Sequence, residues 1–243
     1  MRAAVAVALL SLTVAGCSSS QAKSARLAKG AAKRAVQGRV TAGPANRSVE
    51  VTGTQVLTRD GATAAVVTLR NTGARAQAQL PVQIKVLDRR GRPVYANDLE
   101  GLQPALQQMA YLGARARAYW VHDQVVADGT PRRLRVRVGR APVPAPPGPP
   151  PRIVLRGLHL AHDTTGVFAT GRVENRSRLV QRNMPIFAVA RRGGRVIAAG
   201  RAIIERLDPA PQPKPTVFRI FFVGDPRGAT LDVRPAPTVL EGR

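Results

Sequence analysis

Two short stretches of the sequence bring histidine and aspartate together, and these are the side chains that could bind a metal ion or act in catalysis. They are His159-Leu160-Ala161-His162-Asp163 and His122-Asp123. On a strand, residues three positions apart point to opposite faces, so a metal at His159 and His162 would need ligands from other strands. His122 has no serine or cysteine nucleophile in a recognisable setting. We therefore expect polar residues beside turns, with no cofactor, no metal and no enzymatic activity.

Cys17 is the only cysteine among the 243 residues, so the chain has no intramolecular disulfide. It follows Arg2 and an uncharged, mostly apolar run over residues 3–16. This is the three-part pattern of a secretory signal, and the run is shorter than the roughly twenty residues that a membrane-spanning helix needs. A buried core helix is the alternative, but it usually carries a polar stripe, which is missing here.

The end of the apolar run, Leu12-Thr13-Val14-Ala15-Gly16-Cys17, resembles the lipobox of bacterial lipoproteins, in which small residues precede an acylated cysteine. The resemblance implies that residues 1–16 are a signal peptide and that Cys17 is the site of lipid attachment. The protein is then expected on the outer face of a cell membrane, held by membrane lipid through the acylated Cys17.

The net charge is +24, and residues 1–44, 45–140 and 141–243 are each basic. This excess of arginine fits a coding bias, or else an attraction to anionic lipid, envelope polymers or nucleic acid. Only 4% of the residues are aromatic, which makes nucleic acid the least expected partner. Residues 17–48 are rich in Ala, Ser, Gly and basic residues, so we expect a disordered tether, with a membrane-hugging basic segment as the alternative.

A proline-rich stretch over residues 141–151 favours an extended linker. Its two flanks, residues 49–140 and 152–243, repeat the same signals in the same order. The matched pairs are Asn71-Thr72-Gly73 with Asn175-Arg176-Ser177, Pro81 with Pro185, Leu102-Gln103-Pro104-Ala105 with Leu207-Asp208-Pro209-Ala210, and Tyr119-Trp120-Val121-His122-Asp123 with Phe221-Phe222-Val223-Gly224-Asp225. We therefore expect two copies of one fold that unfold independently, with proteolysis in the tether or the linker.

The local pattern in both copies is that of β-strands. Residues Arg133 to Val138 alternate strictly, which places Leu134 and its apolar neighbours on one face and Arg133, Arg135 and Arg137 on the other. About seven short strands in each copy predict an all-β fold of two β-sandwiches. The Asn-led turns, the strand Ile84-Lys85-Val86-Leu87-Asp88 and the Leu-x-Pro elements resemble the FxLYD-type and related immunoglobulin-like domains of envelope lipoproteins. That resemblance implies an extracytoplasmic interaction module.

Arg133, Arg135 and Arg137 are the candidate binding residues outside the anchor, since three arginines on one strand face could hold an anionic polymer. The alternative is an edge strand protected by charge against pairing. Two functions follow from the sequence. One is a tethered, non-catalytic scaffold that contacts envelope polymers or envelope proteins. The other is a small-solute or metal-binding accessory lipoprotein with a pocket between the sandwiches, lined by His159, His162 and acids.

The lipid anchor gives a first prediction. Cys17→Ser removes the thiol that accepts the lipid, so the protein should leave the membrane fraction or accumulate as an unprocessed precursor. Metabolic labelling with a radioactive fatty acid, followed by fractionation, measures both effects. Unchanged labelling and unchanged membrane association would show that Cys17 is not the attachment site.

Overall fold

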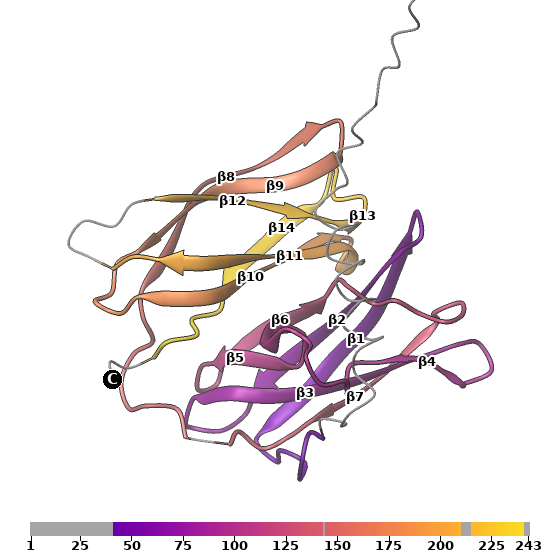
Figure 1. Cartoon of the computed structure of the whole chain (residues 1–243), viewed down its shortest axis with the longest axis horizontal. Helices are drawn as coiled ribbons and strands as arrows, with labels where there is room; N and C mark the ends of the chain where they lie inside the picture. Colours follow the sequence, from indigo (N-terminus) through magenta and orange to yellow (C-terminus); the bar gives the residue numbers. More distant parts are fainter. Residues whose placement is uncertain (1–40, 143, 210–214, 241–243) are drawn as a thin grey trace, which may run out of the picture.

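The computed structural model describes residues 41–142, 144–209 and 215–240, and these residues form an antiparallel, all-β structure (Figure 1). The predicted signal peptide, Cys17 and the tether up to residue 40 lie outside the described residues. The first seven strands are β1 (Val49–Arg59), β2 (Ala62–Asn71), β3 (Gln77–Leu87), β4 (Pro93–Ala96), β5 (Gln108–Leu112), β6 (Arg117–His122) and β7 (Arg133–Val138), with a short 3-10 helix η1 (Pro104–Leu106). The next seven are β8 (Ile153–Asp163), β9 (Gly166–Asn175), β10 (Gln181–Arg192), β11 (Arg195–Leu207), β12 (Thr216–Phe221), β13 (Val223–Gly224) and β14 (Thr230–Pro235).

The first sandwich, residues 49–138, packs a sheet of order β1-β2-β6 against a sheet centred on β3. Both β4 and β7 pair with residues 85–87 of β3, so they lie on its opposite edges. β5 pairs with residues 77–81 of the same strand. The core between the sheets contains the fully buried Leu69, Ile84 and Trp120.

The second sandwich, residues 153–235, repeats this arrangement with a sheet β8-β9-β12 and a sheet β13-β11-β10-β14. The Asn-led turns are equivalent in the two sandwiches. Asn71 Oδ1 accepts a hydrogen bond from the Gly73 amide at 2.9 Å, and Asn175 Oδ1 accepts one from the Ser177 amide at 3.0 Å. Both asparagine side chains are fully buried and also donate to carbonyls on neighbouring segments. The predicted all-β sandwich fold is therefore confirmed.

Two of the repeat matches made from the sequence are out of register. The side-chain Nδ2 of Asn71 donates to the Leu112 carbonyl, as Nδ2 of Asn175 does to that of Leu207, so Leu207 corresponds to Leu112 and not to Leu102. In the same way, Trp120 lies opposite Val67, whereas Phe218 lies opposite the equivalent Gly171. The reason is an insertion in the first sandwich, between β4 and β5. These two short strands pair with β3 at the position where the second sandwich has one continuous strand, β11, beside β10.

The last residues of the expected tether belong to the first sandwich. Ala42 is buried, the Asn46 amide donates to the Val138 carbonyl at 2.9 Å, and Ala45 forms a bridge with Gly139. Gly139 is required for this close approach, because a Cβ there would overlap the Ala42 carbonyl oxygen. The expected end of the tether at residue 48 is corrected accordingly: residues 42–48 lie against the end of β7.

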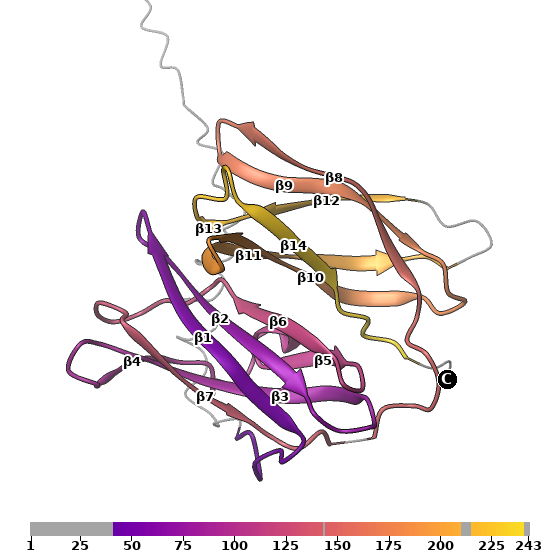
Figure 2. The same cartoon turned by 180° about the vertical axis from the view of Figure 1, so that it is seen from behind.

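The two sandwiches share a buried interface, so that the sheets stack in four layers (Figures 1 and 2). Strand β2 is buried on both faces, and β10 is buried at every position from Met184 to Ala190. In β10, Ile186 points into the second sandwich, whereas Phe187 and Val189 join the apolar cluster of the first sandwich. The middle layers of the stack are therefore β1-β2-β6 and β13-β11-β10-β14.

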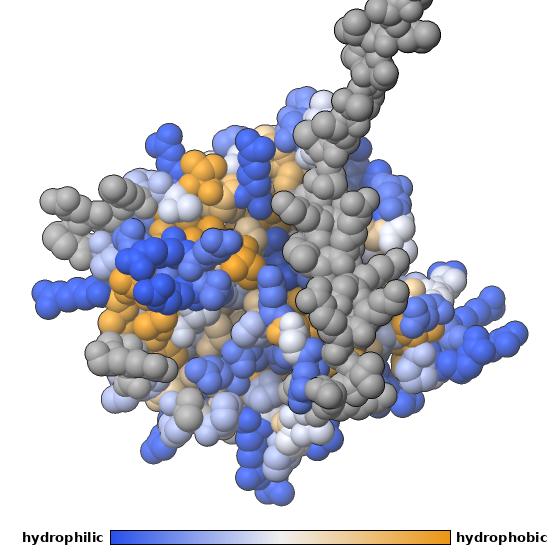
Figure 3. All heavy atoms as spheres, in the orientation of Figure 1, coloured by the Kyte–Doolittle hydropathy of each residue, from blue (hydrophilic) through white to orange (hydrophobic). Residues whose placement is uncertain are grey.

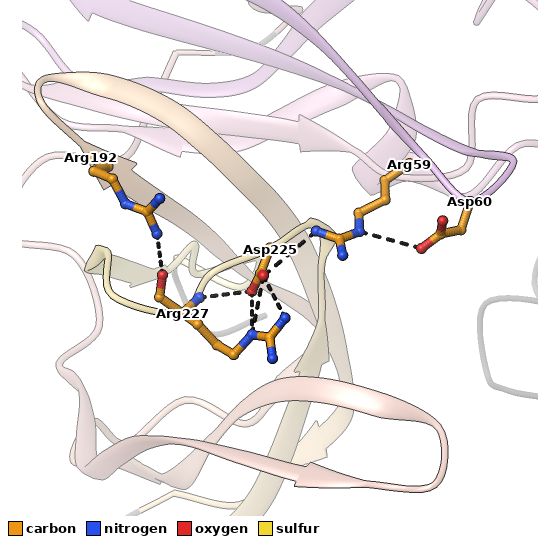
Figure 4. A network of polar contacts seen from close by, with 5 residues as sticks. All are labelled: Arg59, Asp60, Arg192, Asp225 and Arg227. Carbon is orange, nitrogen blue, oxygen red and sulfur yellow. Dashed lines mark hydrogen bonds and ion pairs between the residues drawn. The ribbon is translucent and has the colours of Figure 1, made fainter.

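Polar contacts flank this apolar interface. Arg201 of β11 donates from Nε to Asp123 Oδ1 at 2.7 Å, and the two side chains are only 3% and 9% exposed. At the tip of the β1–β2 hairpin, Arg59 Nη1 lies 3.7 Å from Asp225 Oδ2, and Arg227 also binds Asp225 (Figure 4). The hydrogen bond from the Arg227 side chain is the main reason that the pKa of Asp225 lies well below its usual value.

The shared interface changes the expectation that the two copies unfold independently. The apolar cluster of the first sandwich includes Phe187, Val189, Ala199 and Val223 of the second, so separating the sandwiches would expose part of a core. A buried ion pair crosses the same interface. We therefore expect one cooperative transition for both sandwiches together.

Asp123→Ala tests how strongly this interface is held together. The substitution leaves the Arg201 guanidinium buried without its counter-ion, and breaking a buried pair in this way costs about 3–5 kcal/mol. Asp208→Ala is the matched control, because its pair with Arg206 is about half exposed and should contribute less than about 1 kcal/mol. Denaturant unfolding of the two variants and the wild type measures the difference. Equal destabilisation by the two substitutions would contradict a stabilising interface.

Candidate functional site

The row of arginines that the sequence predicted as a binding surface lies on the outer face of the β3–β7 pair. Arg133, Arg135 and Arg137 of β7 are all exposed, while Leu134 and Val136 between them are partly buried against the first core. Strand β3 adds Lys85, which is exposed and directly opposite Arg135. We call these four side chains the basic face.

The local sequence explains why the basic face points outward. Apolar side chains alternate with arginine along β7, and burying Leu134, Val136 and Val138 turns every arginine to solvent. β3 follows the same alternation, with Ile84 and Val86 buried on either side of the exposed Lys85. The antiparallel register of the two strands then places Lys85 beside the middle arginine.

The two outer arginines are held in place without losing their charge. Arg133 Nη2 donates to the Arg89 carbonyl at 3.2 Å, and Arg137 Nη2 donates to the Gly43 carbonyl at 2.7 Å. A carbonyl orients a guanidinium but leaves its positive charge unbalanced. Among the described residues, Arg135 and Lys85 have neither a hydrogen bond nor an ion pair through their side chains.

Like charges directly opposite each other destabilise a sheet, and an acid can relieve this repulsion, as it does at one other basic pair of this structure. Arg156 and Arg172 face each other on β8 and β9, but Glu174 lies 3.1 Å from Arg156 Nε. The hydrogen bond from Arg176 is the main reason that the pKa of Glu174 is lowered. No described acid forms an ion pair with the basic face, so its four positive charges reinforce one another.

The positive surface continues from the basic face into the β3–β4 turn. A hollow of about 570 Å³ is lined there by Arg89, Arg90 and Arg92 together with Asp88 and Asp128, among others. Asp88 is balanced by Arg92, whose Nε lies 2.8 Å from Asp88 Oδ2. Hydrophilic side chains project from this end of the first sandwich, at the right of Figure 3.

His122 and Asp123 do not form a catalytic pair. His122 is fully buried, its Nε2 lies 2.7 Å from the Tyr95 hydroxyl, and its Nδ1 accepts a hydrogen bond from the Gln124 amide at 3.4 Å. Asp123 binds Arg201 of the second sandwich instead. Burial, reinforced by the charge of Arg201, lowers the pKa of His122 to about 3. The histidine is therefore a neutral residue of the core.

His159 and His162 lie on β8, where the register turns them to opposite faces of the sheet, as predicted. His159 is exposed, and its Nδ1 lies 2.8 Å from the Gly157 carbonyl oxygen. Asp163 accepts hydrogen bonds from Thr165 and pairs with Arg219 at 3.6 Å. Within the described ranges, no group of three or more His, Cys, Asp or Glu side chains is arranged to hold a metal ion.

One pocket between the sandwiches is built from residues other than those expected. Its volume is about 440 Å³, and its lining includes Gln103, Asp123, Arg201, Glu205 and Arg219, but neither histidine of β8. Sequence reasoning also missed Lys85 as part of the basic face. Its exposure follows from the alternation of β3, but its position opposite Arg135 depends on the pairing of strands that are far apart in the sequence.

Cys17 lies outside the described residues, so its surroundings add nothing to the prediction of lipid attachment. In the part of the chain that the structure describes, there is no helix of the length and apolarity that crossing a membrane requires. A comparison with known protein families and with curated proteins found no match to this chain.

The burial of His122 predicts a specific dependence of stability on pH. Its pKa is about 3 in the folded protein against 6.5 ordinarily, so between these values only the unfolded chain binds the proton. Above its ordinary pKa the histidine is neutral in both states, so it does not change the free energy of unfolding. Below that pKa the free energy of unfolding falls by about 1.4 kcal/mol per pH unit as the pH drops toward 3.

The measurement is urea unfolding of wild type, His122→Asn and His159→Asn from about pH 6.5 down to about pH 4. The His122 variant should show a flatter decline than the wild type, although it starts from a lower stability. His159→Asn removes an exposed histidine and should keep the wild-type slope. Parallel curves for all three proteins would exclude His122 as the source of acid sensitivity.

Proposed function

We propose that this protein is a membrane-anchored, extracytoplasmic lipoprotein that acts as a non-catalytic interaction or scaffolding module of the cell envelope. In this proposal, Cys17 carries the lipid and the basic face binds an anionic envelope polymer. The observation that carries the proposal is the unneutralised row of Arg133, Arg135 and Arg137 with Lys85 opposite its centre.

The cost of the basic face supports a binding role for it. The arginines of the edge strand β7 would by themselves protect that edge against pairing, whereas Lys85 on the central strand β3 adds a repulsive charge opposite Arg135. An anionic ligand would attract both Lys85 and Arg135 and so offset the repulsion between them. The same four charges would then provide both affinity and a marked dependence on salt.

The position of the basic face supports anchored binding. Arg137 contacts Gly43, close to where the N-terminal segment joins the first sandwich. The second sandwich packs on the opposite side of the β1-β2-β6 sheet, so it does not cover the outer face of the β3–β7 pair. A polymer bound there and a lipid at Cys17 would together hold the module between a membrane and the surrounding envelope.

The test is binding of the full-length protein, in neutral detergent, to purified anionic envelope polymer across a series of salt concentrations. Replacing Arg133, Arg135 and Arg137 with serine should weaken binding about tenfold or more at low salt, since each exposed ion pair contributes up to about 1 kcal/mol. The loss should shrink as salt rises. The variant should fold with about the stability of the wild type, because the loss of two exposed hydrogen bonds is offset by relief of the repulsion with Lys85.

The matched control replaces Arg172, Arg182 and Arg195 with serine. These arginines are exposed on β9, β10 and β11 and lack side-chain ion pairs with described residues, so the control loses the same charge from another part of the surface. It should bind nearly as the wild type does. If both triple variants lose affinity equally, binding reflects total charge alone and the basic face is not a site.

A further inference from the structure

We propose that the basic face selects a phosphodiester polymer in which a three-carbon polyol separates successive phosphates. This inference rests on the proposed function above, because it specifies the chemistry of the polymer that the same face binds. It follows from the spacing of the cations, from the donors that they leave free and from the side chains that lie beside them.

The spacing of the arginines comes from strand geometry. Alternate residues on one face of a strand are about 7 Å apart, so Arg133, Arg135 and Arg137 present guanidinium groups at two equal steps along β7. A polymer that runs along the strand can pair one anionic group with each arginine only if its charges recur at this interval. A phosphodiester chain extended over a three-carbon polyol has about this repeat.

The orientation of the arginines favours phosphate. The hydrogen bonds of Arg133 and Arg137 to main-chain carbonyls use Nη2, which leaves the remaining guanidinium donors free. Arginine binds phosphate oxygens through two parallel N–H donors, and such charged hydrogen bonds are stronger than neutral ones. Lys85 adds a second cation at the central position, directly opposite Arg135.

The side chains beside the basic face favour binding of a polyol phosphate over other polyanions. Gln83 lies opposite Arg137 and is partly exposed, and its amide can bond to polyol hydroxyls. Single-stranded nucleic acid has a similar phosphate interval, but its binders usually provide aromatic stacking platforms. No aromatic residue lies on the β3 or β7 strands, and Trp120 of the same sandwich is fully buried.

The experiment compares probes that differ in the interval between charges or in the chemical groups between the charges. Full-length protein in neutral detergent is titrated with poly(glycerol phosphate), with inorganic polyphosphate of equal total charge, with oligothymidylate of equal charge and with glycerol 3-phosphate. Poly(glycerol phosphate) should bind about tenfold more tightly than either of the other polymers, and the monomer should bind far more weakly than all three. Arg135→Ser, which interrupts the regular interval, should remove the preference for poly(glycerol phosphate) over polyphosphate.

The outcomes separate this inference from the proposed function. If all polymers of equal charge bind equally, and binding is lost in the Arg133, Arg135 and Arg137 triple variant, the binding face stands and the selection by interval is wrong. Equal or tighter binding of oligothymidylate alone would overturn the assignment to polyol phosphate. If no polymer binds in a way that depends on these arginines, the proposed function itself fails.

Discussion

Burial of the central strands β2 and β10 of the two middle sheets on both of their faces is the constraint on which the rest of the structure depends. Apolar side chains of β2 and β10 fill their own sandwiches and also the space between the sandwiches. The pair of Asp123 and Arg201 crosses this space nearly excluded from solvent, where an unpaired charge would be costly. The two outermost sheets, in contrast, each have one face that does not pack against another sheet.

The positions of the acidic residues determine which arginines of this arginine-rich chain remain available to bind an anionic partner. Several arginines lie two positions from an acid that they bind, as Arg206 does with Asp208 and Arg234 with Asp232. These pairs neutralise charge locally and contribute little to stability, since they are exposed. Strand β7 contains no acid at all, and its arginines form ion pairs with none of the described acids.

The route of the chain connects this face to the N-terminal segment. Residues 42–48 pack on the end of β7, and Gly43 provides the carbonyl that orients Arg137. A close contact of Gly139 with Ala42 makes the junction compact. Because this junction is part of the first sandwich, the orientation of the basic face relative to the incoming chain is set by packing.

The sequence by itself determined the strand class, the outward row of Arg133, Arg135 and Arg137, and the Asn-led turns, because alternation and turn chemistry act between near neighbours. Only the tertiary structure decided that Lys85 lies opposite Arg135 and that Asp123 binds Arg201 and not His122. The uninterrupted apolar run from Met184 to Ala190 is a signal of burial on both faces. That run does not identify the sheet against which β10 packs, since strand pairing and sheet stacking depend on residues far apart in the chain.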